Sequence, residues 1–400
     1  MPVTPSIGID ALSLCVPQGY LELSDLAEAR GVPPSKYIEG LGVRRMAVAQ
    51  PWEDPVALAA NAARRLFATS GADPGQVGLC VVGTETAVDH SKPVSAYLHG
   101  LLGLPQRARV YEAKHACFGG TAGLFTALDW IASGSSRGRS ALVICTDIAR
   151  YELRSAGEPT QGAAAVAMLV AERPRLLSLE PGISGSYSRD VNDFWRPLYR
   201  KDAVVDGHHS VQCYLDALSG AYGAWKEVCA EADLHAALAR RCYHVPYGKM
   251  ARKAHRHARA LDGIDEAAAD ASFAAEVAPS LALPAEVGNI YTGSLYLSLA
   301  SLLNAEASTL EGARVGLFSY GSGCTAEFFA GRVVAGAGAH AASLDLAQPL
   351  EGRRRYSVAE YESIRAADAD SDRRPRGEVG ARPGEVAFAG ISGEQRVYLR

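Results

Sequence analysis

Four side chains that could do chemistry stand directly after short segments of this sequence that favour strands. Cys117 ends the polar approach "EAKHA" and precedes "FGGTAGLFTALDWIASG", which has the length and composition of a buried helix. Glu85 follows the apolar run "VGLCVVGT", His244 follows "RRCY", and Asn289 opens "NIYTGSLYLS". A thiol, an imidazole and an amide together suit acyl transfer through a thioester, and the carboxylate adds a base.

The position of Cys117 suggests how its thiol could be activated. A helix N-terminus carries unpaired N–H groups and a partial positive charge, and both stabilise an anion. Such a position can lower a cysteine pKa from about 8.5 to roughly 3.5–7.5, so we expect an easily ionised thiol. Gly119 and Gly120 would let a substrate or a neighbouring backbone approach, and N–H groups of the turn could serve an oxyanion. The alternative is one more buried cysteine, and position alone does not separate the two.

The other cysteines and the histidine pairs favour structural roles. The eight cysteines form no C-x-x-C pair, and we expect most to be reduced thiols packed as small apolar residues. The pairs His208/His209 and His255/His257 lie in polar stretches without a cysteine or carboxylate at matching spacing, which predicts a solvated surface rather than a metal site. We therefore expect neither a metal nor a resident cofactor.

The composition excludes several classes of partner. The chain has 400 residues, 48% of them hydrophobic, and a net charge of -4 without a clustered basic stripe. Nucleic acid and anionic membranes are therefore not the expected partners, and any basic docking patch must be local. The N-terminus has no basic segment followed by an apolar run, and no segment offers about 18 uninterrupted apolar residues. We expect a cytoplasmic protein without a membrane span.

Apolar runs bounded by turn residues alternate with longer helical patterns. Segments 77–86, 140–149 and 314–323 have the length of buried strands, and segments 54–71, 124–134 and 294–304 have helical length. This alternation predicts an α/β fold with helices covering a mostly parallel sheet. The tail from about residue 350, including segment 363–384, is rich in Arg, Asp and Gly, which predicts an exposed loop before a final strand-like segment, 385–399.

The chain also divides into two halves with a similar order of strands, turns and helices. We expect one half over 1–170, with Glu85 and Cys117, and the other over 171–400, with His244 and Asn289. Each half has a strand that enters a turn with reactive side chains and continues into a helix. Because the internal similarity of sequence is faint, the duplication is a hypothesis.

Several long segments together resemble one known family. They are "VVGTETAVDHSK", "EAKHACFGGTAG", "ALVICTDIARYELRSAGEPTQGAAAVAMLV", "DVNDFWRP", "YHVPYGKM", "VGNIYTGSLYLSLASLL" and "GLFSYGSGCTAEFF". In this order they resemble the 3-hydroxy-3-methylglutaryl-CoA (HMG-CoA) synthases, from about residue 5 to the C-terminus. The resemblance implies a thiolase-like layered αβαβα fold with internal duplication, and a homodimer.

The resemblance also implies a role for each residue. Cys117 would take an acetyl group from a thioester, and Glu85 would remove a proton from its methyl group and later protonate the product alkoxide. His244 and Asn289 would hold the β-ketoacyl thioester that the resulting carbanion attacks. Other positions match the family near the substrates: Tyr151 and Ser322 beside the acyl groups, Lys249 and Lys253 beside pantetheine phosphates. The two lysines could equally be solvated helix charges.

Alternatives to this interpretation stay open. A Cys/His/Asn set would also suit a decarboxylating β-ketoacyl synthase, but that enzyme needs no base such as Glu85. A thiolase-fold scaffold would need no poised thiol. Within the family, one branch uses CoA thioesters in the mevalonate pathway and the other uses acyl carrier proteins in polyketide β-branching. "PWEDP", "TAG" and "GSGC" favour the carrier-protein branch, whereas "GEPTQGAAAVAM" and "DVNDFWRP" favour the CoA branch. We expect the carrier-protein branch.

Overall fold

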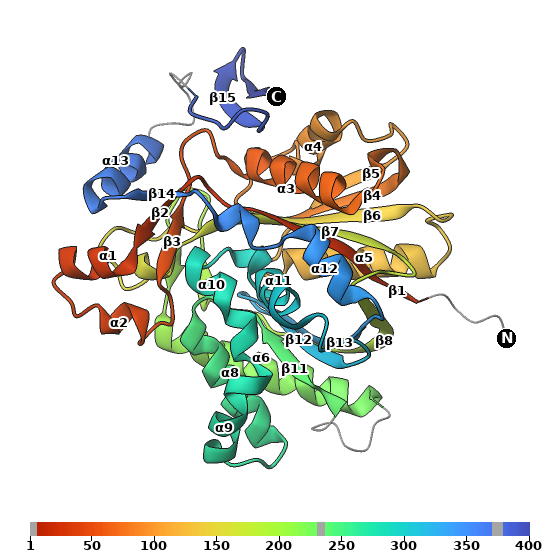
Figure 1. Cartoon of the computed structure of the whole chain (residues 1–400). Coiled ribbons are helices and arrows are strands. Elements are labelled where there is room, and N and C mark those ends of the chain that lie inside the picture. Colours follow the sequence, from red (N-terminus) through yellow and green to blue (C-terminus); the bar gives the residue numbers. More distant parts are fainter. Residues whose placement is uncertain (1–5, 230–236, 370–378) are drawn as a thin grey trace.

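The computed structural model describes residues 6–229, 237–369 and 379–400, and most of their strands join one curved sheet (Figure 1). Nine described strands form it in the order β11-β12-β13-β8-β1-β7-β6-β4-β5. Their bounds are β1 (Ile7–Cys15), β4 (Val77–Gly83), β5 (Arg109–Ala113), β6 (Ser140–Ile148), β7 (Ala163–Glu172), β8 (Leu177–Ser188), β11 (Arg240–Tyr243), β12 (Arg314–Gly321) and β13 (Thr325–Val333).

The order of these strands repeats within the sheet. In the first half β4 pairs parallel with β6, β6 antiparallel with β7, and β7 antiparallel with β1. In the second half β11, β12, β13 and β8 follow with the same directions. The two sets join where β1 pairs with β8. The expected α/β fold with internal duplication is confirmed, whereas the division at residue 170 stays a prediction that this repeat supports.

The sheet is mixed, so the expectation of a mostly parallel sheet was wrong. Antiparallel pairs arise where one strand returns directly beside the previous one. β12 turns into β13 through only residues 322–324, and segment 149–162 leads from β6 to β7 with no α-helix between them. A parallel return needs a crossover of a dozen or more residues, usually helical, and neither connection forms one.

Helices cover and separate the two halves of the sheet. α3 (Pro55–Ser70) packs on β1, β6 and β7, and α6 (Gly207–Val228) packs on β8 and β13. α5 (Gly119–Ala132) lies between the halves: it packs on β4 and β6, and its Thr121 donates a hydrogen bond to Ser319 of β12 at 2.7 Å. α11 (Ser294–Glu306) joins α5 in this middle layer through a 2.7 Å contact of Tyr296 with Thr121. The result is the expected αβαβα layering.

The helices begin and end where the sequence predicts. Asp54 caps α3 by accepting a hydrogen bond from the Ala57 N–H at 2.8 Å, and Pro55 occupies the first turn. Gly71 ends α3 with a φ of 72°, a left-handed value that glycine adopts without a steric penalty. α5 and α11 match the other two predicted helices, so all three predictions are confirmed.

A smaller lobe packs beside the first half (Figure 1). It holds the sheet β14-β2-β3 and several helices: β2 (Gly19–Glu22), β3 (Arg45–Val48), β14 (Arg354–Tyr356), α1 (Leu23–Ala29), α2 (Ser35–Ile38), α10 (Ala282–Val287) and α13 (Val358–Ala369). The second half carries α8 (Gly248–Leu261) and α9 (Glu266–Glu276), and the first half carries α4 (Val94–Leu102). α12 (Ala337–Leu344) packs on α3 and α11. Two short hairpins complete the fold: β9 (Phe194–Trp195) with β10 (Val204–Val205), and β15 (Ala387–Ser392) with β16 (Gln395–Leu399).

The structure corrects the expectation for the C-terminal segment. Residues 354–356 and 358–369, expected in an exposed loop, form β14 and α13, because Tyr361 is buried there and Arg365 makes several hydrogen bonds. Residues 370–378 of the predicted loop lie outside the described part of the chain. Segment 385–399 forms a hairpin rather than one strand, because the chain reverses at Gly393 and Glu394 with positive φ.

The structure also corrects one histidine pair. His255 is fully buried in α8, where it contacts the Ser272 hydroxyl at 2.9 Å and packs on Phe273. Burial lowers the pKa of His255 to about 4, so the ring is a neutral core residue rather than a solvated one. Among the described residues, no three side chains of the ligating types gather as a metal would need. Nor does any described helix combine the length and apolar character that crossing a membrane requires.

Candidate active site

The functional candidates gather where strands end. Glu85 follows β4, Cys117 follows β5, His244 follows β11, and Ser322 follows β12. Gly321 brings the two halves of the sheet together at this point. A Cβ there would lie 2.6 Å from the His115 carbonyl oxygen and 2.7 Å from Phe118, so β12 touches the turn that carries Cys117. Carboxyl ends of strands are the usual ligand edge of open α/β sheets, and here two such edges meet.

Glu85 and Cys117 are in direct contact. The Cys117 Sγ donates a hydrogen bond to the Glu85 Oε1 at 3.3 Å, and the thiol is only 9% exposed. The backbones of β4 and α5 make this contact possible, because a Cβ at Gly83 would lie 2.3 Å from the Gly120 nitrogen. The glycines beside the thiol were expected to allow a substrate or a neighbouring backbone to approach closely. The structure shows the close approach of a neighbouring backbone. The candidate nucleophile and the candidate base therefore share one hydrogen bond.

Two residues near the thiol have strained backbone conformations. Ala116, just before Cys117, has a φ of 38°, and Tyr291 across the site has a φ of 45°. Residues other than glycine rarely adopt such left-handed values, which cost on the order of 1–3 kcal/mol each and persist only where surrounding contacts impose them. The turn is thus held by tertiary packing rather than by its own sequence preference.

Charged groups around Glu85 set its basicity. Asp147, fully buried at the end of β6, accepts a hydrogen bond from the Glu85 N–H at 2.9 Å. Arg196 donates to the Glu85 backbone carbonyl, and its Nη2 lies 3.8 Å from the Glu85 Oε2. Burial, assisted by the nearby Asp147, raises the pKa of Glu85 to about 8, and Arg196 opposes the rise. Glu85 therefore titrates close to neutral pH, which suits a general base and acid.

The thiol does not have the low pKa that the sequence suggests. Burial raises the pKa of Cys117 well above its usual value, and the charges of Glu85, Asp147 and Asp193 raise it further. The expectation of an easily ionised thiol was wrong, because the helix terminus acts against desolvation and three carboxylates. Cys117 rests as a thiol whose proton points at Glu85.

This geometry predicts slow alkylation of Cys117 in the resting protein. Iodoacetamide reacts with thiolates, so at pH 7 Cys117 should react at least about tenfold more slowly than free cysteine, and the rate should climb up to pH 9. Mass spectrometry of the Cys117 peptide after timed alkylation measures this rate. In a Glu85→Gln variant the rate should exceed that of the wild type above pH 8, where Glu85 is otherwise charged. Rapid alkylation of wild-type Cys117 at pH 7 would refute the raised pKa.

Aromatic side chains enclose the thiol. Tyr151, Phe194 and Tyr291 form one buried cluster with Cys117, and Phe194 packs edge-on against both tyrosines at 6.1 and 5.7 Å. Burial raises the pKa of Tyr151 above its usual value, so its hydroxyl stays protonated. The structure therefore places Tyr151 beside the thiol, as the resemblance implies, in a pocket wall that limits access of water.

His244 is held by its backbone and by an aromatic neighbour. The His244 backbone N–H donates to the Phe318 carbonyl, and the His244 carbonyl accepts from the Tyr214 hydroxyl, both at 2.8 Å. The imidazole ring stacks on the Tyr214 ring. Burial lowers the pKa of His244 to about 3, so the ring stays neutral through the physiological range. A neutral imidazole can donate one hydrogen bond to a carbonyl oxygen without bringing a charge into the site.

Asn289 is fixed by the first turn of the helix that follows it. Its Oδ1 accepts hydrogen bonds from the Tyr291 N–H and the Ser294 hydroxyl, both at 2.9 Å. Its own N–H donates to the Thr160 carbonyl at 3.0 Å. With the side-chain oxygen held by two donors, the amide nitrogen is the group left to donate to a substrate.

The remaining candidates are Ser322 and two lysines of α8. Ser322 is half-buried directly after β12. Lys249 and Lys253 are exposed on α8, one turn apart. The structure thus joins Glu85 and Cys117 directly, whereas substrate-binding roles for the other six candidates stay predictions.

Sequence reasoning missed three residues of this site. Asp147 was overlooked although it ends the apolar run "SALVICTD", the same signal that pointed to Glu85. Arg196 and Asp193 lie in the "DVNDFWRP" segment, which follows β8, a strand of the main sheet whose sequence "LSLEPGISGSYS" is not an apolar run. Asp193 is fully buried and accepts a hydrogen bond from the Tyr320 hydroxyl at 2.6 Å. Only the fold brings this segment over the thiol.

Comparisons with known proteins agree with this site. The family description "Hydroxymethylglutaryl-coenzyme A synthase N terminal" matches residues 3–174, and its "C terminal" counterpart matches residues 177–262 and 257–371. The chain is 41% identical to the hydroxymethylglutaryl-CoA synthase of Enterococcus faecalis, over 92% of this chain and 93% of that one. It is 33% identical to the polyketide-biosynthesis 3-hydroxy-3-methylglutaryl-ACP synthase of Bacillus subtilis, over 90% and 88% of the two chains.

Solved structures give the same result. MvaS in complex with 3-hydroxy-3-methylglutaryl coenzyme A superposes with a TM-score of 0.95 at 49% identity, and 99% of each chain is covered. The HMG synthase of the curacin biosynthetic pathway, also solved with an acetyl donor-ACP, superposes at 0.92 with 32% identity, over 98% of this chain and 99% of that one. With a cysteine and a glutamate in contact at the meeting point of two thiolase-like halves, this chain belongs to the hydroxymethylglutaryl-CoA synthase family of acyl-transferring, carbon–carbon bond-forming enzymes.

Proposed function

We propose that this protein condenses an acetyl and an acetoacetyl thioester, both carried on CoA, into HMG-CoA. The observation that carries the chemistry is the 3.3 Å hydrogen bond between the Cys117 thiol and Glu85, whose pKa of about 8 suits proton transfer in both directions. The acyl groups arrive activated as thioesters, so the proposal needs no resident cofactor.

The first step is transfer of the acetyl group to Cys117. As Sγ bonds to the acetyl carbon and the bond to the CoA sulfur breaks, the thiol proton passes to Glu85 along their hydrogen bond and then to the departing CoA thiol. Proton removal has to accompany the attack, because burial and nearby carboxylates disfavour a free thiolate. The carboxylate is regenerated beside the new acetyl group.

The second step forms the carbon–carbon bond. Glu85 takes a proton from the acetyl methyl, and the resulting carbanion attacks the β-ketone of acetoacetyl-CoA. His244, neutral because its pKa is about 3, and Asn289, with its amide nitrogen available, donate hydrogen bonds to carbonyl oxygens of that substrate. Glu85 then returns its proton to the tertiary alkoxide, and water hydrolyses the Cys117 thioester to free the product and the thiol.

CoA is the proposed carrier because similarity is greater on that side of the family. The Enterococcus enzyme, named for a CoA substrate, is 41% identical, whereas the Bacillus enzyme, named for an acyl carrier protein, is 33% identical over a similar length. Lys249 and Lys253, exposed one turn apart on α8, could hold the CoA phosphates. The comparisons do not confirm the carrier-protein branch expected from the sequence.

Several sequence motifs favour the carrier-protein branch, which is therefore the second candidate function. "PWEDP", "TAG" after the Cys117 turn and "GSGC" ending at Cys324 favour it, and the curacin relative has been solved with its donor-ACP. A carrier protein would meet this chain at a local basic patch, because the net charge of this chain is -4.

The deciding experiment compares the two carriers. Purified protein is given acetyl-CoA with acetoacetyl-CoA, or acetyl-loaded with acetoacetyl-loaded carrier proteins, and intact-mass spectrometry follows both products and acetyl uptake on Cys117. Efficient HMG-CoA formation from the CoA pair supports the proposal. An HMG-sized mass on the carrier protein alone would favour polyketide β-branching, and no acetyl uptake from either donor would favour a non-catalytic scaffold.

The pH dependence of condensation should report the pKa of Glu85. Below about pH 8 the carboxyl group is protonated and cannot act as a base, so the rate should fall about tenfold per pH unit, with a plateau above pH 8. His244, with a pKa of about 3, should contribute no transition between pH 6 and 9. Arg196→Met removes the cation near Glu85 and should move the midpoint upward by about one unit. A midpoint unchanged in that variant would contradict the role of Arg196.

We further propose that the enzyme works as a homodimer in the cytoplasm. β5 has β4 as its one partner among the described strands, which leaves an edge where a second copy could pair. Sedimentation equilibrium should give twice the chain mass of 42.2 kDa.

A further inference from the structure

Tyr151 forms part of the wall around the reactive thiol. It belongs to the buried cluster with Cys117, and its ring packs edge-on against Phe194 at 6.1 Å. Its side chain can keep this place only if its backbone is held, yet Tyr151 begins an irregular segment, 149–162, rather than a helix or strand. The hydrogen bonds to its backbone groups therefore decide where the phenol ring lies.

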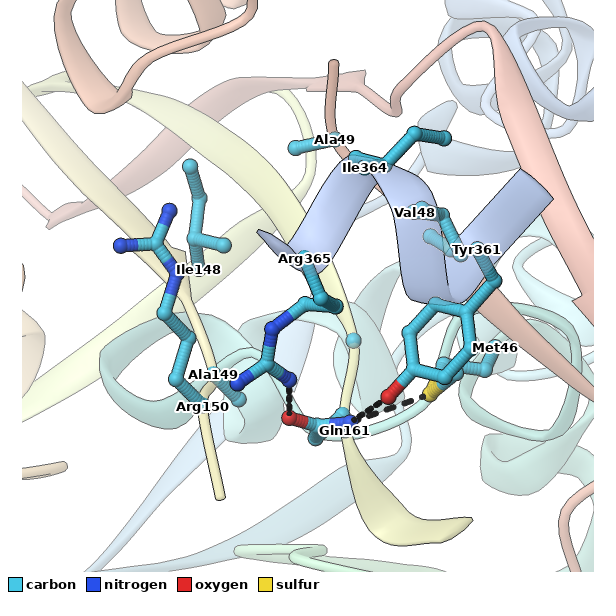
Figure 2. A pocket seen from close by; sticks show the side chains of 12 residues that line it. Met46, Val48, Ala49, Ile148, Ala149, Arg150, Gln161, Tyr361, Ile364 and Arg365 are labelled. Carbon is cyan, nitrogen blue, oxygen red and sulfur yellow. Dashed lines mark hydrogen bonds between the residues drawn. The ribbon is translucent and has the colours of Figure 1, made fainter. Parts of the chain in front are cut away.

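Both backbone groups of Tyr151 are held by side chains, one from the end of the same segment and one from the distant helix α13. The Tyr151 N–H donates to the Gln161 Oε1 at 2.8 Å, and the Arg365 Nη2 donates to the Tyr151 carbonyl at 3.0 Å. The Arg365 Nη1 also donates to that same Gln161 oxygen (Figure 2). One guanidinium group thus closes a ring of hydrogen bonds around the Tyr151 backbone.

Arg365 reaches the site because α13 is fixed at several points. Its Nη2 also pairs with Asp202 at 2.9 Å, in the hairpin that carries Phe194. One helical turn earlier, the Tyr361 hydroxyl accepts a hydrogen bond from the Gln161 Nε2 at 2.8 Å, as Figure 2 shows. Beside it, Glu362 pairs with Arg30 at 2.8 Å. The helix is therefore a rigid platform for the guanidinium group.

The same segment also supports Asn289. The Thr160 carbonyl, one residue before Gln161, accepts the Asn289 N–H at 3.0 Å. Glycines allow the two backbones to meet, because a Cβ at Gly162 would lie 2.5 Å from the Val287 carbonyl oxygen. Movement of segment 149–162 would therefore disturb both Tyr151 and Asn289.

We propose that Arg365 is a positioning residue: it holds Tyr151 over Cys117 so that the acetyl-enzyme is shielded from water until the second substrate arrives. This inference rests on the proposed function, because the protected species is acetyl-Cys117. Loss of Arg365 should expose that thioester, so that water consumes acetyl groups that would otherwise form product. The step that changes is premature hydrolysis, in which water attacks the acetyl carbon and releases acetate and the Cys117 thiol.

An arginine is needed at this position by geometry. Its planar guanidinium donates at once to a backbone carbonyl, an amide oxygen and a carboxylate, whereas a lysine ammonium is a compact group that cannot reach three separated acceptors in one plane. Arg365→Lys should therefore keep the charge and most of the helix docking, but lose part of the positioning.

The test measures the ratio of HMG-CoA to free acetate formed from labelled acetyl-CoA at several acetoacetyl-CoA concentrations. Arg365→Ala should lower this ratio about tenfold or more, since a misplacement of 1 Å can cost about 10² in rate, and should leave the rate of Cys117 acetylation within about threefold. Arg365→Lys should fall between the two. Arg355→Ala is the matched control, because Arg355 lies in the same C-terminal segment, is exposed and pairs with Asp25. An unchanged ratio in Arg365→Ala would overturn the inference.

Two further measurements separate positioning from loss of fold and from failure of the proposed function. Millimolar methylguanidinium should restore part of the product ratio in Arg365→Ala and none in Arg355→Ala. Hydrogen exchange followed by mass spectrometry should show faster exchange of segment 149–162 in Arg365→Ala alone, a readout that needs no turnover. Unchanged exchange there would overturn the inference, whereas absent Cys117 acetylation in the wild type would refute the proposed function.

Discussion

Replacing Cys117 with alanine should abolish acetyl uptake and lower the rate of HMG-CoA formation by at least about 10³-fold. Removal of a covalent nucleophile costs losses of this order or larger, because no other group can form the acyl-enzyme intermediate. The Cys117 thiol contacts Glu85 and lies in the buried cluster with the aromatic side chains, so we expect no neighbouring side chain to take its place. Intact-mass spectrometry after mixing with acetyl-CoA should show the added acetyl mass on the wild type and none on Cys117→Ala.

A matched variant separates this effect from general loss of a cysteine. Cys229 is a free, half-buried thiol at the end of α6, away from the site, and Cys229→Ala should retain acetylation and turnover. Thermal unfolding of both variants should show similar stability, since both replace one thiol with a methyl group. Retained acetyl uptake by Cys117→Ala would show that another residue is the nucleophile and would remove the basis of the proposed mechanism.

Replacing Glu85 with glutamine should separate acetylation from condensation. Glutamine keeps the size of the side chain and a hydrogen-bond acceptor for the Cys117 thiol, but it cannot accept a proton from carbon. General-base catalysis typically contributes about 10²–10⁴-fold, and condensation in Glu85→Gln should fall by that factor. Acetylation should persist and be faster at pH 9 than at pH 7, because the ionised fraction of the Cys117 thiol grows with pH and the charge of Glu85 no longer opposes the thiolate.

Deuterium exchange tests the carbon-acid step directly. With acetyl-CoA alone in D₂O, the wild type should incorporate deuterium into the methyl group of acetyl-Cys117, and Glu85→Gln should not. Asp147 is the alternative base to consider, because its carboxylate lies beside Glu85. Its oxygens already accept hydrogen bonds from Thr86 and Thr292, so we expect it not to take the proton. Deuterium uptake in Glu85→Gln at the wild-type rate would assign the base to another group such as Asp147.

Glu85→Gln should have opposite effects on condensation and on alkylation of Cys117, which makes the prediction specific. Above pH 8 the same substitution should speed iodoacetamide modification of Cys117, because it removes a negative charge from beside the thiolate. A variant that merely disturbed the fold would not slow condensation and speed alkylation in this pH-dependent way.

The sequence alone determined the elements and the reacting groups. The lengths of the apolar runs at 77–86, 140–149 and 314–323 predicted strands, and Asp54, Pro55 and Gly71 marked the ends of α3, because these signals depend on neighbours along the chain. The types and order of Glu85 and Cys117 pointed to thioester chemistry for the same reason. The long motifs then gave the family, which the comparisons confirm.

Tertiary structure alone decided the electrostatics and the support of the site. The helix terminus suggested an acidic thiol, but the pKa of Cys117 depends on burial and on Glu85, Asp147 and Asp193, which come from distant segments. Likewise, segment 363–369 has the composition of a loop and becomes helical because Tyr361 and Arg365 find partners around Gln161, some 200 residues earlier in the chain. Local sequence sets which conformations and charges are available, whereas desolvation and long-range contacts exist only once the chain has folded around them.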